Sequence, residues 1–405
     1  MGEYDDREHF IPIRKSDLIG LLCREPDLSP AERDEFQRLC RLTEATFHFE
    51  YHQTLERLKD AYAAFDPDAE TRELTPVSPE EKEKRLDSLF ADFNYLLAKA
   101  NFHRLTREEI NQALEGASAW GLDLEVDFSL FNRLEVYARG DIIQRRPRPK
   151  SIWNRLRKTK EVEVPVFQRL VVILRLADKK GLGDKVDTNS VYIKVFKDIP
   201  KQDLEMLLPG TRVKMSLLDR GKIGLPLLTG LGLTGYKLAG LGGAFLMTSN
   251  PFVLLGLAGG TVGYGVRSFH GYLQTKQRYQ LTLTQSLYFL NLDNNAGVLF
   301  RILDEAEEQE CREAILGYYF LWRHAGPEGW TAAELDDRVE EYLEKAAHVK
   351  VDFEIGDALD KLKRLKMVEQ LPSGRLRAVP IRAALEALDY AWDNYFKYNQ
   401  DLDET

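Results

Sequence analysis

Two histidines stand one helical turn apart in His48-Phe-Glu50-Tyr-His52, a spacing that lets two imidazoles face one metal ion. Zinc proteases of the H-E-x-x-H type need a glutamate directly after the first histidine, whereas here Glu50 comes one place later. The sequence offers no identifiable third ligand, so we favour a helix face over a metal site. We predict no metal ion.

Two further motifs resemble ligand sites and fail on spacing. Gly230-Leu-Gly232-Leu-Thr-Gly235 matches a dinucleotide loop, but the acidic residue expected about 20 positions later is absent, and the next one is Asp293. Asn291–Gly297 faintly resembles a calcium loop, but its twelfth position is Ile302 instead of glutamate; a helix–turn–helix corner fits better. The sequence also lacks a Walker A lysine and a nucleophile elbow, so we predict no cofactor and no enzymatic activity.

Basic residues gather in two places. The loop 145–160 contains Trp153 and no acidic residue, and it suggests either a solvated loop or contact with anionic lipid headgroups. The residues predicted for headgroup contact are Arg145, Arg146, Arg148, Trp153, Arg155, Arg157 and Lys158. The second group lies on a predicted helix and β-hairpin near the C-terminus and is arranged as in DNA-binding proteins: Lys361, Lys363, Arg364, Lys366, Arg375 and Arg377.

The overall charge and the cysteines limit the function classes. The chain has 405 residues and a formal net charge of −9, which disfavours non-specific nucleic-acid binding. Its 44% hydrophobic and 30% charged residues indicate folded domains, and the length suggests two or three. Cys23, Cys40 and Cys311 are widely spaced and predict neither a disulfide framework nor a zinc ribbon.

The segment 223–266 predicts a membrane hairpin. Apolar residues fill 223–247 and 252–266, and Thr248-Ser-Asn-Pro251 separates the two runs. Cations flank both ends, so we expect both termini on the cytoplasmic or matrix side of a multi-pass protein, in a bacterial inner membrane or a mitochondrial membrane. Lys237 would be an intramembrane charge. Gly256, Gly259, Gly260 and Gly263 have the spacing of packed membrane helices, which predicts a homo-oligomer.

The remaining elements follow from caps and periodicity. Capping boxes at Ser29–Glu32, Ser78–Glu81 and Thr106–Glu109 predict a helical N-terminal domain over 1–125. Alternating and β-branched runs predict a small α+β juxtamembrane domain over 126–218. The transmembrane hairpin (219–273) and connecting helices (274–310) would lead to a winged-helix-like domain over 311–400, with Ser373-Gly374 at the tip of the wing. The predicted fold class is therefore α+β, mainly helical.

Several segments together resemble the transmembrane protein 143-like family of uncharacterised membrane proteins. They are Arg7–Lys15, Tyr51–Lys59, Leu134–Gly140, Asp198–Pro200, Leu207–Met215 and Asn291–Asn295. The resemblance implies a membrane location and supplies no activity or catalytic residues.

Three functions remain open from the sequence. The first is a non-enzymatic scaffold or interaction protein that forms homo-oligomers and binds the lipid bilayer and an unidentified protein partner. The second is an oligomeric glycine-rich pore. The third is a membrane-tethered winged-helix regulator that binds DNA, although we consider nucleic acid the less favoured partner.

Overall fold

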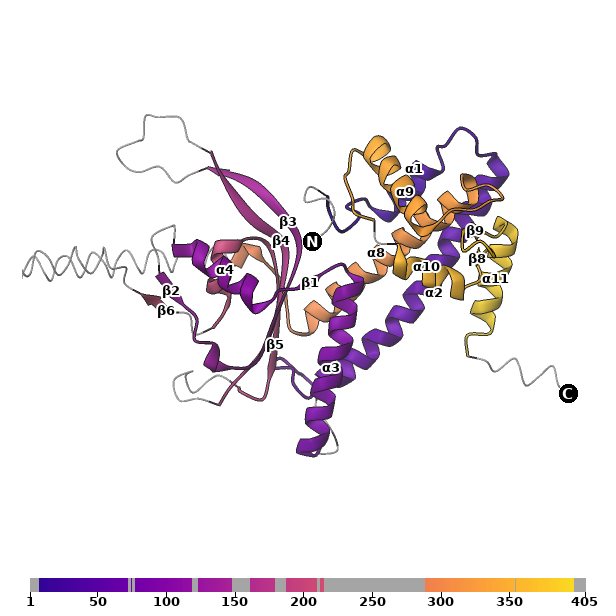
Figure 1. Ribbon diagram of the computed structural model, residues 1–405. Helices are drawn as coiled ribbons and strands as arrows, with labels where there is room; N and C mark the ends of the chain where they lie inside the picture. The colour runs from indigo at the N-terminus through magenta and orange to yellow at the C-terminus, as the bar shows by residue number, and fades with distance from the viewer. Residues whose placement is uncertain are drawn as a thin grey trace, which may run out of the picture.

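The computed structural model describes residues 7–71, 74, 77–118, 123–147, 161–178, 187–209, 212–214, 288–353 and 355–396. Its centre is an antiparallel sheet with the strand order β1-β3-β4-β5-β7. These strands are β1 (His103–Arg104), β3 (Phe131–Pro147), β4 (Glu161–Leu176), β5 (Val191–Pro200) and β7 (Asn291–Asn294). Figure 1 shows helices on both sides of this sheet.

Long helices begin where the sequence supplies caps. Helix α2 (Pro30–Tyr62) begins with a complete capping box between Ser29 and Glu32. Helix α3 (Pro79–Lys99) is capped by Ser78, and α4 (Arg107–Ser118) follows Thr106, whose hydroxyl accepts from the Glu109 N–H. A short helix α1 (Lys15–Leu22) precedes α2. The three helix starts predicted from capping boxes are confirmed.

The two faces of the sheet have separate hydrophobic cores. One face carries Tyr137, Val171 and Val195 and packs on α2, α3 and the first half of α8 (Ala296–Arg323). The other face carries Val136, Leu170 and Phe196 and packs on α4 and the 3-10 helix η3 (Lys201–Leu207). A two-stranded sheet of β2 (Asp123–Glu125) and β6 (Arg212–Lys214) and the 3-10 turn η1 (Phe128–Leu130) complete this side.

A third core belongs to the C-terminal part of the chain. The second half of α8 packs with α9 (Ala332–Ala347), α10 (Gly356–Arg364) and α11 (Ile381–Asp393), and with the hairpin of β8 (Val368–Gln370) and β9 (Leu376–Ala378). The β-hairpin with Ser373-Gly374 at its tip is the one that the sequence predicts. Helices α2 and α8 both run through this core and the core on the sheet, so they join the two parts (Figure 1).

The N-terminal residues cross between the same two parts. Glu8 pairs with Val351 as an isolated parallel bridge, in which Glu8 N donates to Lys350 O (3.0 Å) and Asp352 N donates to Glu8 O (2.9 Å). Ile11 is 1% exposed and lies in the C-terminal core. The first described residues are therefore part of the packed structure.

The predicted fold class is wrong in two respects. The sheet is not confined to the small domain predicted over 126–218, because the strands β1 and β7 lie outside that range and join it. Helix α8 packs on the sheet with its first half and continues past residue 310 into the C-terminal core. Asn291–Asn294, predicted as a helix–turn–helix corner, forms the edge strand β7, whose residues Asn294, Asp293 and Asn291 are paired with Lys194, Val195 and Phe196 of β5.

The predicted two-helix membrane hairpin is not supported. Residues 219–273 lie outside the described part of the chain, and within that part no helix combines the length and the apolar character needed to span a bilayer. The multi-pass membrane location was predicted from this hairpin and from the family resemblance, and it is corrected because the described residues contain no helix that could span a bilayer.

Candidate functional site

Most residues of the predicted membrane-related sites lie outside the described residues. These are Lys237, Gly256, Gly259, Gly260, Gly263, Arg148, Trp153, Arg155, Arg157 and Lys158. Arg145 and Arg146 lie near the end of β3, where the β3–β4 hairpin extends beyond the helices (Figure 1). Arg145 Nε lies 3.5 Å from Glu163 Oε1 on the opposite strand, and both side chains are exposed. This contact is a surface ion pair of small energetic weight.

The two histidines on α2 do not converge on a common ligand. His48 Nδ1 lies 3.1 Å from Glu307 Oε2 of α8, and its side chain is 72% exposed. His52 is also exposed. Among the described residues, no group of three histidine, cysteine or carboxylate side chains is arranged to hold a metal ion.

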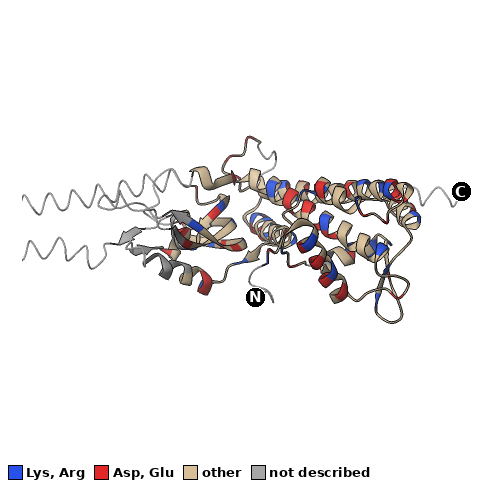
Figure 2. Cartoon of the chain, turned by 90° about the horizontal axis from the view of Figure 1, so that it is seen from above, with Lys and Arg blue, Asp and Glu red and all other residues tan. Residues whose placement is uncertain are grey.

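The basic residues of α10 and the hairpin are largely paired within the chain. Arg364 Nη2 lies 2.7 Å from Glu50 Oε1 of α2. On the hairpin, Arg375 Nη2 lies 2.6 Å from Glu334 Oε2, and Arg377 Nη2 lies 2.6 Å from Glu369 Oε1. Figure 2 shows that basic and acidic residues alternate along the helices. Because α10 uses its cations against α2 and α8, this geometry disfavours the DNA-binding alternative.

Glu310 forms a buried charged node where the two cores meet. Its side chain is 1% exposed, and it pairs with Lys99 of α3 (3.1 Å) and with Lys361 of α10. The Lys361 ammonium also lies over the rings of Phe47 (4.2 Å) and Tyr51 (4.6 Å) on α2. Burial, followed by the Glu310 charge, raises the pKa of Tyr51, so its hydroxyl stays neutral. This node fastens α10 to α2, α3 and α8.

An exposed group of rings lies beside this node. Phe49 of α2 contacts Trp392, Tyr395 and Phe396 at centroid distances of 5.8, 4.7 and 5.6 Å. Trp392 is 43% exposed and Phe396 is 62% exposed. We call these four residues the aromatic surface. Exposed Trp and Phe side chains grouped in this way are typical of protein-binding surfaces.

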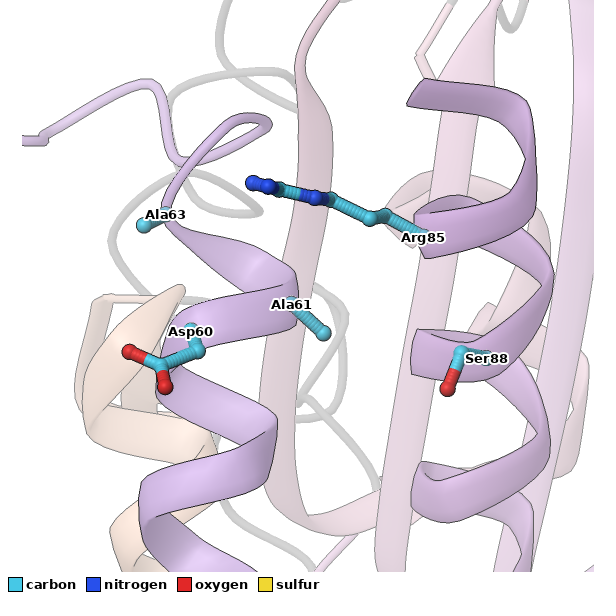
Figure 3. A pocket seen from close by; sticks show the side chains of 5 residues that line it. All are labelled: Asp60, Ala61, Ala63, Arg85 and Ser88. Atoms are coloured by element: carbon cyan, nitrogen blue, oxygen red, sulfur yellow. The ribbon is translucent and has the colours of Figure 1, made fainter. Parts of the chain in front are cut away.

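A cleft lies between α2 and α3. Its volume is about 470 Å³, and its walls are Asp60, Ala61, Ala63, Arg85 and Ser88. Figure 3 shows Arg85 reaching from α3 toward Ala63, with Asp60 and Ser88 on opposite helices. These five residues do not include a nucleophile with an adjacent base, so the cleft does not have the arrangement of an active site.

Comparison with known proteins gives a partial family match. A family model described as a protein of unknown function (DUF3754) matches residues 167–297, from the middle of β4 to the start of α8. No solved structure matches the chain. The expected relationship to the transmembrane protein 143-like family is not supported, because nothing in these comparisons links the chain to it.

Sequence reasoning missed the Glu310 node and the aromatic surface. One signal was present for the node: Ala306, Glu310, Glu313 and Gly317 follow each other at helical spacing on the buried side of α8. Carboxylates on the apolar side of a helix indicate that they have buried cationic or hydrogen-bonding partners. The sequence of α8 alone does not show which residues those partners are. No comparable signal marks the aromatic surface, because Phe49 is distant in sequence from Trp392 and Phe396.

Proposed function

We propose that this protein is a non-enzymatic scaffold whose copies associate through the aromatic surface of α2 and α11. The observation that carries the proposal is the exposure of Trp392 on α11 and of Phe396 just past the end of α11, both beside Phe49 of α2. Rings held on rigid helices lose little conformational entropy on binding, which favours their use in interfaces.

A second copy is the proposed partner because the surface has opposite charges at its two ends. Helix α11 runs alongside α2 in the same direction: Arg382 Nε lies 2.8 Å from Glu35 Oε1 near its start, and Tyr395 Oη lies 3.2 Å from Gln53 Oε1 beyond its end. Asp389 therefore lies toward one end of the aromatic surface, and Arg57, one turn past Gln53, lies toward the other.

Both terminal charges are available for a partner. Asp389 and Arg57 are exposed, neither forms an ion pair among the residues that the structure describes, and Arg57 donates to the Thr54 hydroxyl. A two-fold axis through the rings would place each Arg57 opposite the Asp389 of the other copy, which makes the surface self-complementary.

Sedimentation velocity on the purified full-length protein tests this proposal. We expect a concentration-dependent dimer whose Kd rises at least about tenfold in a Trp392→Ala/Phe396→Ala variant, because central aromatic anchors dominate interface energies. Phe300→Ala is the matched control, since Phe300 is an exposed ring (49%) on α8. A monomeric wild type, or a double variant that dimerises like the wild type, would refute the proposal.

A charge exchange tests the two-fold arrangement independently of ring packing. Arg57→Asp should weaken the dimer, and Arg57→Asp combined with Asp389→Arg should restore it, because each opposed pair regains opposite charges. If the combined variant is weaker than Arg57→Asp alone, the proposed pairing is wrong.

A further inference from the structure

Three cations lie side by side across the sheet. Arg139 of β3 is the register partner of Arg169 of β4, and Arg169 is the register partner of Lys197 of β5. Directly opposed residues of antiparallel strands project from the same face with Cβ atoms about 5 Å apart, and like charges in these positions repel. This row therefore needs negative charge nearby.

The row lies at the border of the core under α2, α3 and α8. Tyr137, Val171 and Val195, each two positions away from a member of the row, belong to that core. Gly140 and Asp198, which adjoin the row, have positive φ angles of 70° and 51°. Phe167 and Ile199, two positions past Arg169 and Lys197, belong to the core on the opposite face of the sheet. The regular alternation of side chains between the two faces is therefore interrupted at this row.

Arg139 has its own partners. Its Nη2 lies 2.8 Å from Glu305 Oε2 of α8, and its Nη1 donates to Ala100 O (3.0 Å). Its guanidinium lies over the rings of Phe10 and Phe102 at 4.7 and 4.6 Å. Burial lowers the pKa of Arg139, and the positive charges of Arg169 and Arg312 act in the same direction. Arg139 is 6% exposed, and its Nε has no acceptor.

Arg169 and Lys197 have no such compensation. In the described structure Arg169 donates only to the neighbouring Gln168 O (2.9 Å), and its buried Nε has no acceptor. Lys197 has neither a carboxylate partner nor a hydrogen bond from its side chain within the described ranges, and both side chains are half-buried.

The α8 carboxylates Glu305 and Glu308 are engaged by other cations, and the Glu8 carboxylate interacts with Arg139. Glu305 pairs with Arg139 and lies 3.9 Å from Arg301. Glu308 pairs with Arg312 (2.9 Å) and Lys15 (2.8 Å). Glu305 and Glu308 therefore leave the charges of Arg169 and Lys197 uncompensated.

We propose that Arg169 and Lys197, with Arg139 behind them, bind a phosphate-type oxyanion. A tetrahedral anion can accept from the Arg169 guanidinium and the Lys197 ammonium together, because Arg offers a planar set of N–H donors and Lys a compact charge. Bound there, it would offset the repulsion along the row. The anion is either free phosphate or the phosphate group of a small phosphomonoester.

Titration calorimetry on the purified full-length protein tests this site, with inorganic phosphate and glycerol phosphate as separate ligands at constant ionic strength. We expect saturable binding with one site per chain, and a Kd at least about tenfold higher in Arg169→Gln and Lys197→Gln, because each substitution removes a charge-assisted hydrogen bond. Tighter binding of glycerol phosphate would identify an ester as the ligand, and equal binding would identify free phosphate.

Lys194→Gln is the matched control, because Lys194 is an exposed lysine on the same strand and lies opposite Val172 instead of a cation. Thermal denaturation without phosphate checks that the variants fold. The site also predicts that Arg169→Gln/Lys197→Gln is at least as stable as the wild type in the absence of phosphate, since the repulsion is removed. Absence of saturable binding to the wild type, or equal binding to all variants, would overturn the proposal.

Discussion

Replacing Glu310 by glutamine should destabilise the protein strongly. The substitution keeps the shape of the side chain and removes the single carboxylate that Lys99 and Lys361 share. Those two lysine side chains are only 12% and 15% exposed, so water cannot replace the lost partner. Removing one member of a buried ion pair costs about 3–5 kcal/mol, and we expect a loss in this range.

Urea denaturation at pH 7, followed by tryptophan fluorescence and far-UV circular dichroism, measures this loss. Glu341→Gln is the control, because Glu341 pairs with Lys345 (48% and 72% exposed) on the surface of α9. Removing that exposed pair should leave the stability nearly unchanged. Adding Lys361→Met to Glu310→Gln should restore part of the stability, since it removes a buried charge whose remaining carboxylate, Glu50 Oε2, lies 3.9 Å away. A Glu310→Gln variant within about 1 kcal/mol of the wild type would refute the description of Glu310 as the node that fastens α10 to the helices.

Three further predictions concern the C-terminal core. Ile11→Ala should lower the free energy of unfolding by about 2–5 kcal/mol, because it leaves a cavity where a side chain is 1% exposed; urea denaturation measures it, and a loss below about 1 kcal/mol would show that the N-terminal segment is not packed there. Gly317→Val should cost about 1–3 kcal/mol in the same assay, since a Cβ at Gly317 would already lie 3.0 Å from Ile355 Cδ1. Stability should fall as the pH rises from about 4 to about 7 and level off above that, because burial, then the Glu340 charge, raises the pKa of Asp336 from its ordinary value to about 7 and the folded state holds this proton more tightly than the unfolded state. Asp336→Asn should flatten that part of the pH profile, and an unchanged profile would contradict the assignment.

The sequence predicted best those features that depend on neighbouring residues. A capping box fixes a helix start within four positions, and the structure contains the hydrogen bonds expected at Ser29 and Thr106. The alternating and β-branched runs within 126–218 correctly predicted the strands β3, β4 and β5. The Ser373-Gly374 tip also lies between β8 and β9, and Gly374 adopts a φ of 82° that favours glycine.

Contacts between distant residues account for what the sequence did not show. Asn291–Asn294 contains turn-forming residues, so its polar composition suggested a corner; it becomes a strand because the edge of β5 offers backbone partners about 100 positions earlier in the chain. The basic edge of α10 resembled a DNA-binding face because the sequence does not show that Glu50 and Glu310 lie against it.

The sequence by itself determined the caps, the periodicity and the strand-forming runs, because each arises from interactions within one or two turns of chain. Only the tertiary structure decided which charges are neutralised, since the pairs Lys361–Glu310, Arg139–Glu305 and Arg364–Glu50 join residues from different helices and strands. The same holds for the row of Arg139, Arg169 and Lys197, which the strand register brings together. The energy of a charge depends on the solvent and counter-charges around it, and the folded chain supplies both.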